Sequence, residues 1–241
     1  MAVKPILFIS DLHLETDRSD ISQAFFSFLE SHASQASTLY ILGDFFNVWL
    51  GDDDRSSLID EVAAALHALS DQGLSIFLMH GNRDFLLGDD FASRCGATLI
   101  QEPYVLEAFG ERYLLMHGDV LCTKDMDYMA FRKLVRQADW QQEFLQKPLA
   151  ERQAFAAHAR QQSKAMSSNK AEDIMDVTEE AVMQTIQNHE VRYLIHGHTH
   201  RPAVHEFTLD GQPAFRYVLS DWEGLIQYVR LDESGLSLLT P

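Results

Sequence analysis

Five short apolar runs in the sequence are each followed at once by a cluster of polar residues. The runs are rich in Ile, Leu, Phe and Tyr and three to six residues long: residues 5–10, 39–42, 76–79, 113–116 and 193–195. Apolar segments of this length are typical of strands that are buried on both faces of a sheet. The recurrence therefore favours a fold in which several buried strands end beside polar loops.

Segments with helical spacing lie between these runs. Apolar side chains recur at helical intervals over residues 21–29 and 58–69, and Thr178 followed by Glu179 and Glu180 is typical of a helix start. Alternating strands and helices indicate an α/β fold. Such sheets place their functional sites at the carboxyl ends of the strands, where the polar clusters of this chain lie.

The sequence pattern changes from about residue 203. Two apolar segments, 204–209 and 213–219, flank Asp210-Gly211, which is typical of a hairpin turn, and segments 225–231 and 236–239 predict two more strands. We expect these strands to form a second, antiparallel sheet that packs against the first, with helices outside.

Residues 124–170 do not follow the alternation of strand and helix. They mix aromatic and basic side chains in long helical stretches, so we expect a helical lid over the strand ends, inserted within a domain that spans residues 1–241. Nine basic and five acidic residues give this segment a charge of about +4, whereas the whole chain carries −17. Charge alone leaves open whether the segment meets an anionic ligand, a membrane surface or only solvent.

The overall composition indicates in which cellular compartment the chain is expected and which partners it is not expected to bind. A net charge of −17 argues against broad electrostatic binding to nucleic acid. The sequence has no apolar run of the roughly 20 residues that span a bilayer, and residues 1–5 do not resemble a signal peptide. We therefore expect a cytoplasmic protein, in which Cys95 and Cys122 are reduced thiols.

The polar clusters contain the side chains that bind divalent metals. Imidazole and carboxylate groups suit Mn, Fe, Co and Zn, and a carboxylate can bridge two ions. Two pairs of these residues are spaced two apart, which directs both side chains to one side of an extended segment. Adjacent glycines permit tight turns and close approach of the backbone. The candidate ligands are Asp11, His13, Asp44, Asn82, His117, His198 and His200.

The ordered set of motifs resembles that of the calcineurin-like metallophosphoesterases. The motifs are Asp-x-His at 11–13, Gly-Asp at 43–44, Gly-Asn-x-Asp at 81–84, His at 117 and Gly-His-x-His at 197–200. The resemblance implies two packed mixed β-sheets flanked by helices. It also implies two divalent cations, with Mn²⁺ as the expected metal, that activate a water for attack on phosphorus.

The resemblance also assigns the ligands. One cation is expected on Asp11, His13, Asp44 and His200, and the other on Asp44, Asn82, His117 and His198, with Asp44 bridging. The residues expected to act in catalysis are Asp44, Asn82, Arg83 and His117. Asp84 and Asp119 are expected to orient the imidazoles that bind metal.

A narrower resemblance, covering nearly the whole chain, is to the members of this family that act in lipid A biosynthesis. It implies cleavage of the diphosphate of UDP-2,3-diacylglucosamine to UMP and 2,3-diacylglucosamine 1-phosphate, with peripheral contact at the cytoplasmic face of the inner membrane. The expected substrate contacts are Asn82, Arg83, Asp125, Ser163, Ser167, Lys170 and His198. Ser167 and Asn47 depart from the Asn and Glu of the close relatives.

Arg83 takes the place of a histidine that most members of the wider family carry after Gly-Asn. Arginine stays protonated and cannot serve as a general acid, but it can clamp phosphate oxygens with two parallel bonds. A phosphate leaving group with a pKa of about 6 needs little protonation. Arg83 therefore favours cleavage of a diphosphate over cleavage of a monoester.

Two alternatives remain open at this stage. One is another nucleotide phosphodiesterase or pyrophosphatase on the same scaffold, against which the aromatic and basic segment argues. The other is a non-catalytic protein that keeps the fold for assembly. Such a protein would be expected to have lost ligands, whereas all seven positions here carry suitable side chains.

Overall fold

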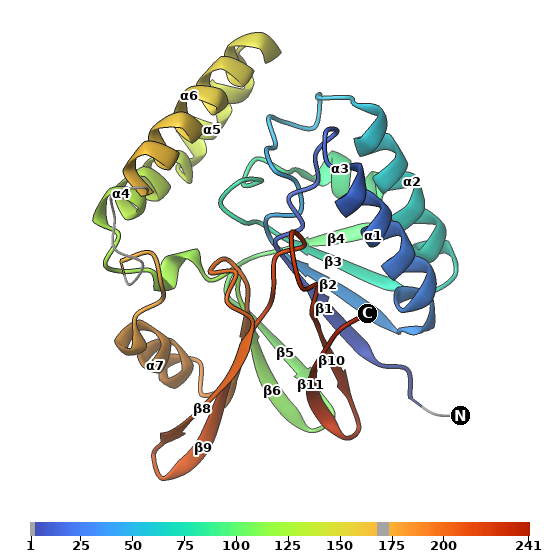
Figure 1. Cartoon of the computed structure of the whole chain (residues 1–241), viewed down its shortest axis with the longest axis vertical. Helices are drawn as coiled ribbons and strands as arrows, with labels where there is room; N and C mark the ends of the chain where they lie inside the picture. Colours follow the sequence, from blue (N-terminus) through green and yellow to red (C-terminus); the bar gives the residue numbers. More distant parts are fainter. Residues whose placement is uncertain (1–2, 168–173) are drawn as a thin grey trace.

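The computed structural model of the chain describes residues 3–167 and 174–241. Two β-sheets pack face to face, with helices on their outer sides (Figure 1). The first sheet has the strand order β11-β10-β1-β2-β3-β4, and its strands β1 to β4 run parallel. Its strands are β1 (Ile6–Ile9), β2 (Thr38–Leu42), β3 (Ser75–Met79), β4 (Ala97–Ile100), β10 (Tyr228–Asp232) and β11 (Gly235–Leu239).

The second sheet has the strand order β5-β6-β7-β9-β8. Its three central strands, β6, β7 and β9, run parallel, and the two edge strands are antiparallel to their neighbours. The strands are β5 (Tyr104–Ala108), β6 (Glu111–Leu115), β7 (Tyr193–His196), β8 (Ala203–Leu209) and β9 (Gln212–Val218). The expected architecture of two packed mixed sheets is confirmed.

The expectation that the C-terminal strands form a separate antiparallel sheet is wrong. β8 and β9 join β7 in the second sheet, whereas β10 pairs with β1 and completes the first. The reason lies in the burial of β10. Tyr228 packs in the core beneath the helices, while Val229 and Leu231 pack between the two sheets. A strand with apolar residues on both faces is stabilised where both faces are covered.

Helices cover the outer face of each sheet (Figure 1). α1 (Ser19–Ser31), α2 (Ser57–Asp71) and α3 (Asp89–Arg94) pack on the first sheet, and α7 (Glu179–Asn188) packs on the second. The helix start expected at Thr178 is confirmed, because its side chain accepts a hydrogen bond from the Ala181 N–H. Besides the apolar residues under the helices, a separate cluster that includes Phe8, Tyr40 and Leu115 packs between the two sheets and determines how they face each other.

Three further helices follow β6 and precede α7 in the chain. They are α4 (Met126–Val135), α5 (Ala138–Leu145) and α6 (Leu149–Ser167), and in Figure 1 they project away from the two sheets. Two short 3-10 helices, η1 (Ala33–Gln35) and η2 (Asp119–Leu121), complete the described elements. Within residues 3–167 and 174–241, no helix combines the length and the apolarity needed to cross a membrane.

The packing of the two sheets brings their strand ends together. His117, after β6, contacts the carbonyl oxygen of Leu42 at the end of β2, with 3.0 Å between Nδ1 and O. The backbone N–H of His198, after β7, donates to Asp11 Oδ2 after β1 at 2.8 Å. The loops that follow parallel strands of both sheets therefore meet at one edge of the molecule.

Candidate metal centre

All seven candidate ligands lie in loops that follow parallel strands. β1, β2 and β3 of the first sheet lead into four of them, and β6 and β7 of the second sheet lead into the other three. Six of them fall into two groups by distance, and Asp44 contacts both. We define the first ligand group as Asp11, His13 and His200, and the second ligand group as Asn82, His117 and His198.

The backbone turns sharply at five of these seven residues. Their φ angles are positive, between 50° and 68°, at Asp11, His13, Asp44, His198 and His200. This left-handed conformation is uncommon outside glycine and costs about 1–3 kcal/mol where the surroundings impose it. Strain of this kind is typical of functional sites. Here the tight turns after the strands direct side chains from different loops toward one point.

The polar atoms of the first ligand group converge. His200 Nε2 lies 3.2 Å from His13 Nε2 and 3.3 Å from Asp11 Oδ1. Asp11 is completely buried and His13 is 5% exposed. Asp11 Oδ1 and His13 Nδ1 are buried without a hydrogen-bond partner among the described residues. Unpaired buried polar atoms are costly, so this arrangement fits a cation that would bind them.

The second ligand group converges on the side-chain oxygen of Asn82. His117 Nε2 lies 2.9 Å from Asn82 Oδ1, and His198 Nδ1 lies 2.8 Å from the same atom. The Leu42 carbonyl can only accept a hydrogen bond, so it holds the proton of His117 on Nδ1 and leaves Nε2 to face Asn82. This orientation suits a nitrogen that donates its lone pair to a metal.

Asp44 lies between the two groups. Its Oδ2 is 3.8 Å from His13 Nδ1, and its Oδ1 is 3.7 Å from His117 Nε2. The side chains of Asp11, Asp44 and His117 also offer ligand atoms that all lie within 4.8 Å of one another. A carboxylate in this position can contact ions on both sides, as the resemblance implies for Asp44.

The buried carboxylates of the cluster stabilise positive charge on two of the neighbouring imidazoles. Burial lowers the pKa of His117, but the carboxylates of Asp44 and Asp11 raise it to about 9. Burial is likewise overcome at His200, where the neighbouring carboxylates of Asp11 and Asp221 raise the pKa to about 10. The same carboxylates would stabilise divalent cations, which could replace these protons.

Two of the four imidazoles remain neutral near pH 7. Burial lowers the pKa of His13 to about 3 and that of His198 to about 4. Neutral imidazole is the form that binds metal. Burial also raises the pKa of Asp44 to about 7, an effect to which Asp84 and Asp11 add.

The expectation that Asp84 orients an imidazole is wrong. Its carboxylate instead accepts hydrogen bonds from the backbone N–H groups of Gly81, at 2.7 Å, and Phe45, at 2.7 Å. Asp84 therefore ties the loop after β3 to the loop after β2. Asp119 is bonded to Tyr128 and to Arg132, whose Nε donates to Asp119 Oδ2 at 2.7 Å.

Two supporting residues were missed by the sequence analysis. Asp221 lies 3.1 Å from His200 Nδ1 and fixes that ring from behind. It follows β9, so the pattern of an apolar run followed by polar residues could have identified it. Glu102 accepts hydrogen bonds from the backbone N–H groups of His117 and Gly118. No local pattern marks Glu102.

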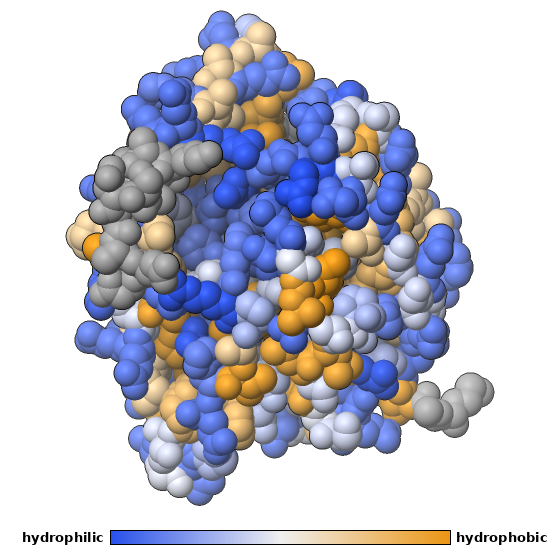
Figure 2. All heavy atoms as spheres, in the orientation of Figure 1, coloured by the Kyte–Doolittle hydropathy of each residue, from blue (hydrophilic) through white to orange (hydrophobic). Residues whose placement is uncertain are grey.

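A cavity of about 950 Å³ opens between the ligand groups and the α4–α6 helices. Asn82, His198 and His200 line one side, and aromatic residues of the helices line the other. Figure 2 shows hydrophilic side chains gathered along the hollow beside these helices, with apolar side chains toward their upper end. The aromatic side chains that line the cavity are Trp49, Phe85, Tyr128, Phe131, Trp140, Phe144 and Phe155.

Arg83 lines the cavity beside Asp44. Its backbone N–H donates to Asp44 Oδ1 at 2.8 Å, and its Nε lies 3.6 Å from Asp44 Oδ2. Its guanidinium also donates to Asn47 Oδ1 at 2.9 Å, an oxygen that accepts from Arg160 of α6 at 3.3 Å. Two arginines therefore meet at the cavity wall next to the second ligand group.

The other expected substrate contacts differ in how much of them the structure describes. Asp125 lines the cavity and caps α4, where its carboxylate accepts from the Tyr128 N–H at 3.1 Å. Ser163 and Ser167 lie in the last turns of α6, for which only the backbone is described. Lys170 lies outside the described residues.

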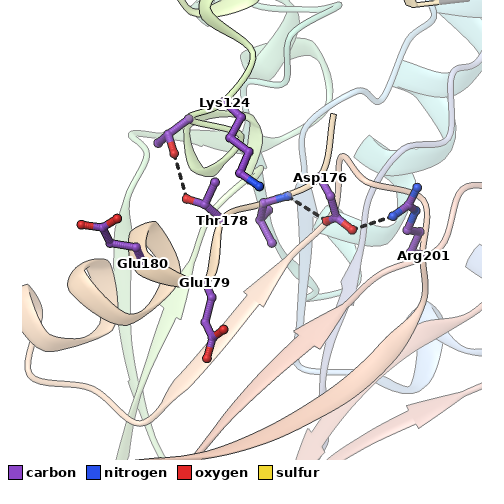
Figure 3. A pocket seen from close by; sticks show the side chains of 8 residues that line it. Lys124, Asp176, Thr178, Glu179, Glu180 and Arg201 are labelled. Carbon is purple, nitrogen blue, oxygen red and sulfur yellow. Dashed lines mark hydrogen bonds and ion pairs between the residues drawn. The ribbon is translucent and has the colours of Figure 1, made fainter. Parts of the chain in front are cut away.

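A second cavity, of about 680 Å³, lies at the base of the α4–α6 helices beside α7. Figure 3 shows that Arg201 points toward Asp176, and the two side chains are 2.6 Å apart. Thr123 and Thr178 are joined by a hydroxyl contact of 2.8 Å. These contacts join the chain on either side of the α4–α6 helices to each other and to the loop that carries His200.

Known proteins are similar to this chain in sequence over most of its length. Residues 4–202 match the family model of the calcineurin-like phosphoesterases. The chain is 53% identical to a UDP-2,3-diacylglucosamine hydrolase of Cellvibrio japonicus, across 96% of this chain and 97% of that one. It is 48% identical to the protein of the same name from Pseudomonas aeruginosa, across 95% and 96%.

Comparison with solved structures agrees with the fold. The structure of an archaeal phosphodiesterase superposes with a TM-score of 0.50, over 98% of this chain and 99% of that one, at 13% sequence identity. That identity supports the fold alone. The family match and the full-length relatives establish more: the chain is a metal-dependent hydrolase that belongs to the calcineurin-like phosphoesterases and, within them, to the family of the UDP-2,3-diacylglucosamine hydrolases.

Proposed function

We propose that the chain hydrolyses the diphosphate of UDP-2,3-diacylglucosamine, giving UMP and 2,3-diacylglucosamine 1-phosphate for lipid A biosynthesis. The observation that carries the proposal is the single cavity that joins the ligand groups to an apolar, aromatic wall. Such a cavity suits a substrate with a charged diphosphate at one end and acyl chains at the other. Relatives that are about half identical across nearly the whole chain carry the name of this activity.

The residues around the second ligand group suit a diphosphate. Two divalent cations, for which we propose Mn²⁺, would supply an activated water and neutralise charge on the phosphoryl oxygens. Arg83 and Arg160 add positive charge at the cavity wall and can form bidentate bonds to phosphate. Arg83 cannot donate a proton to the leaving group, which a phosphate leaving group does not require.

The aromatic wall suits the acyl chains, and we propose that the α4–α6 helices act as a lid over the substrate. Trp140 stacks on Phe144 with ring centroids 4.8 Å apart, and Phe155 packs edge-on against Phe144 at 5.1 Å. All three rings line the cavity. Phe155 is 41% exposed and lines the cavity, so its ring is available to an apolar ligand.

Replacement of Phe155 by Asp tests the acyl-chain wall. A carboxylate there would repel an acyl chain, so KM for UDP-2,3-diacylglucosamine should rise about tenfold, the effect of roughly 1.4 kcal/mol of lost apolar burial. Hydrolysis of bis-p-nitrophenyl phosphate, a small diester without acyl chains, should stay at the wild-type rate. Equal loss on both substrates would contradict the proposed wall.

Contact with a membrane surface is the proposed route to the lipid substrate. The α4–α6 helices carry exposed apolar side chains beside basic ones, a combination that attracts anionic headgroups and inserts into the interface. Outside the cavity lining, the exposed apolar residues of this segment are Met126, Leu134 and Leu145. The segment's charge of about +4 supports a cytoplasmic protein that binds the inner membrane peripherally.

The direct test is incubation of the purified protein with UDP-2,3-diacylglucosamine, with and without Mn²⁺. We expect UMP to be released only when the cation is present, and about two ions to be bound per chain. Equal turnover of short, soluble nucleotide diesters would support the alternative of a general nucleotide phosphodiesterase. A protein that binds no metal and releases no UMP would support the non-catalytic alternative.

A further inference from the structure

We propose that Glu102 and Arg132 are positioning residues that couple helix α4 to the second ligand group. The proposal rests on the proposed function only in treating that group as a cation site. It assigns to α4 a role in metal binding as well as in covering the cavity.

Glu102 holds the loop that carries His117. Its Oε1 accepts hydrogen bonds from the backbone N–H of His117, at 2.8 Å, and from that of Gly118, at 3.1 Å. The side chain of Glu102 is only 8% exposed. A buried carboxylate that binds two consecutive N–H groups restricts where the loop can place the His117 ring.

Arg132 ties this carboxylate to α4. Its guanidinium Nη2 donates to Glu102 Oε2 at 2.9 Å, and its Nε donates to Asp119 Oδ2 at 2.7 Å. Asp119 is fully buried, so the two carboxylates repel each other away from solvent. Arg132 is the cation that both of them contact. Its removal would leave two buried charges without this partner, and the loops that carry them would shift.

Tyr128 lies one turn before Arg132 on the same face of α4. Its hydroxyl donates to Asp119, and its ring lies over His198 with centroids 6.0 Å apart and an angle of 29° between the planes. Helix α4 therefore reaches both imidazoles of the second ligand group. It reaches His117 through Glu102 and touches His198 directly.

These contacts link the order of α4 to the binding of a cation. An ion on the second ligand group would fix the rings of His117 and His198, and through Glu102 and Tyr128 it would favour the docked position of α4. The coupling is reciprocal, because a docked α4 must raise the affinity for the ion by the same factor. The first ligand group is supported from elsewhere, since Asp221 holds His200.

Calorimetric titration of Mn²⁺ into Arg132→Met tests the coupling. We expect one ion to bind with wild-type affinity and the other to bind about 10-fold or more weakly, the usual effect of losing a residue that supports a metal ligand. Arg152→Met is the matched control. Arg152 is a buried arginine that, like the partly exposed Arg132, ties these helices to the rest of the chain, donating to Asp53 Oδ1 at 2.7 Å from α6. Both ions should bind this control as they bind wild type.

Two further measurements keep the test decisive if Arg132→Met fails to fold. Glu102→Gln retains an oxygen for the two N–H groups but loses the ion pair, so it should weaken the same single ion. In the wild-type protein, hydrogen exchange of the α4 amides should slow when Mn²⁺ is added. Wild-type affinity for both ions in Glu102→Gln, or exchange in α4 that ignores Mn²⁺, would overturn the proposal, as would equal weakening in the Arg152→Met control.

The outcome is independent of the substrate. Two ions that bind as described, with no release of UMP from UDP-2,3-diacylglucosamine, would overturn the proposed function and support the coupling. Normal release of UMP with identical metal affinities in wild type, Arg132→Met and Glu102→Gln would do the reverse.

Discussion

Asp44→Asn should lower the rate of UMP release by about 10⁴-fold, the scale on which removal of one essential group affects other hydrolases. The substitution keeps the shape of the side chain but removes the charge that lies between the two ligand groups. The fold should survive it, because burial already raises the pKa of Asp44 to about 7 and makes its charged form costly. Thermal unfolding without added metal should therefore stay near the wild-type temperature.

The loss should be specific to this carboxylate. Asp20→Asn removes a charge from a side chain that is 67% exposed and should leave both activity and unfolding temperature unchanged. Added Mn²⁺ should raise the unfolding temperature of wild type and of Asp20→Asn, but should raise that of Asp44→Asn much less. Near wild-type turnover by Asp44→Asn would show that this residue does not bridge two ions.

Gly81→Ala should be nearly as damaging, although it changes no polar group. A Cβ atom at this position would lie 2.1 Å from Asp44 Oδ1 and 2.2 Å from the Asp44 backbone nitrogen. The backbone nitrogen cannot move without displacing the loop after β2, so we expect a loss of stability of about 3 kcal/mol. A displacement of about 1 Å at Asp44 should lower kcat more than 100-fold.

Gly224→Ala is the matched control for this substitution. A Cβ atom at Gly224 would meet nothing within 4 Å, and its backbone is not left-handed. Its denaturant midpoint and its kcat should equal those of wild type. If Gly81→Ala matched Gly224→Ala in both measurements, the close approach of the two loops would not be a requirement for activity.

The parts of the fold that were predictable are those that depend on local sequence. The continuous apolar runs predicted β1, β2, β3, β6 and β7, and each candidate ligand lies one to five positions after one of these runs. β4 and β5 were missed because their residues are mostly only partly buried and their short apolar stretches lead into no candidate ligand. Local periodicity also does not reveal which strands are neighbours in a sheet. For this reason β10 was expected in the second sheet, whereas it pairs with β1 in the first.

Local sequence also did not reveal the roles of the residues that hold the ligand loops in place. The seven candidate ligands were predictable because each lies in a loop shortly after a strand and because their order resembles that of a known family. Glu102 and Asp84 act on backbone N–H groups far along the chain or across a loop, and a carboxylate with such a role has no characteristic neighbours in sequence. Their function becomes visible only when the folded chain shows which loops lie side by side.

The left-handed turns limit which amino acids can serve as ligands here. Glutamate and cysteine can also bind divalent metals, but aspartate, asparagine and histidine are the non-glycine residues that tolerate positive φ best. Asp11, Asp44 and His13 belong to this narrow class, and each follows its strand in that conformation. The backbone thus selects the chemistry of the centre, and an attempt to retune its metal preference by exchanging ligands would have to redesign the turns first.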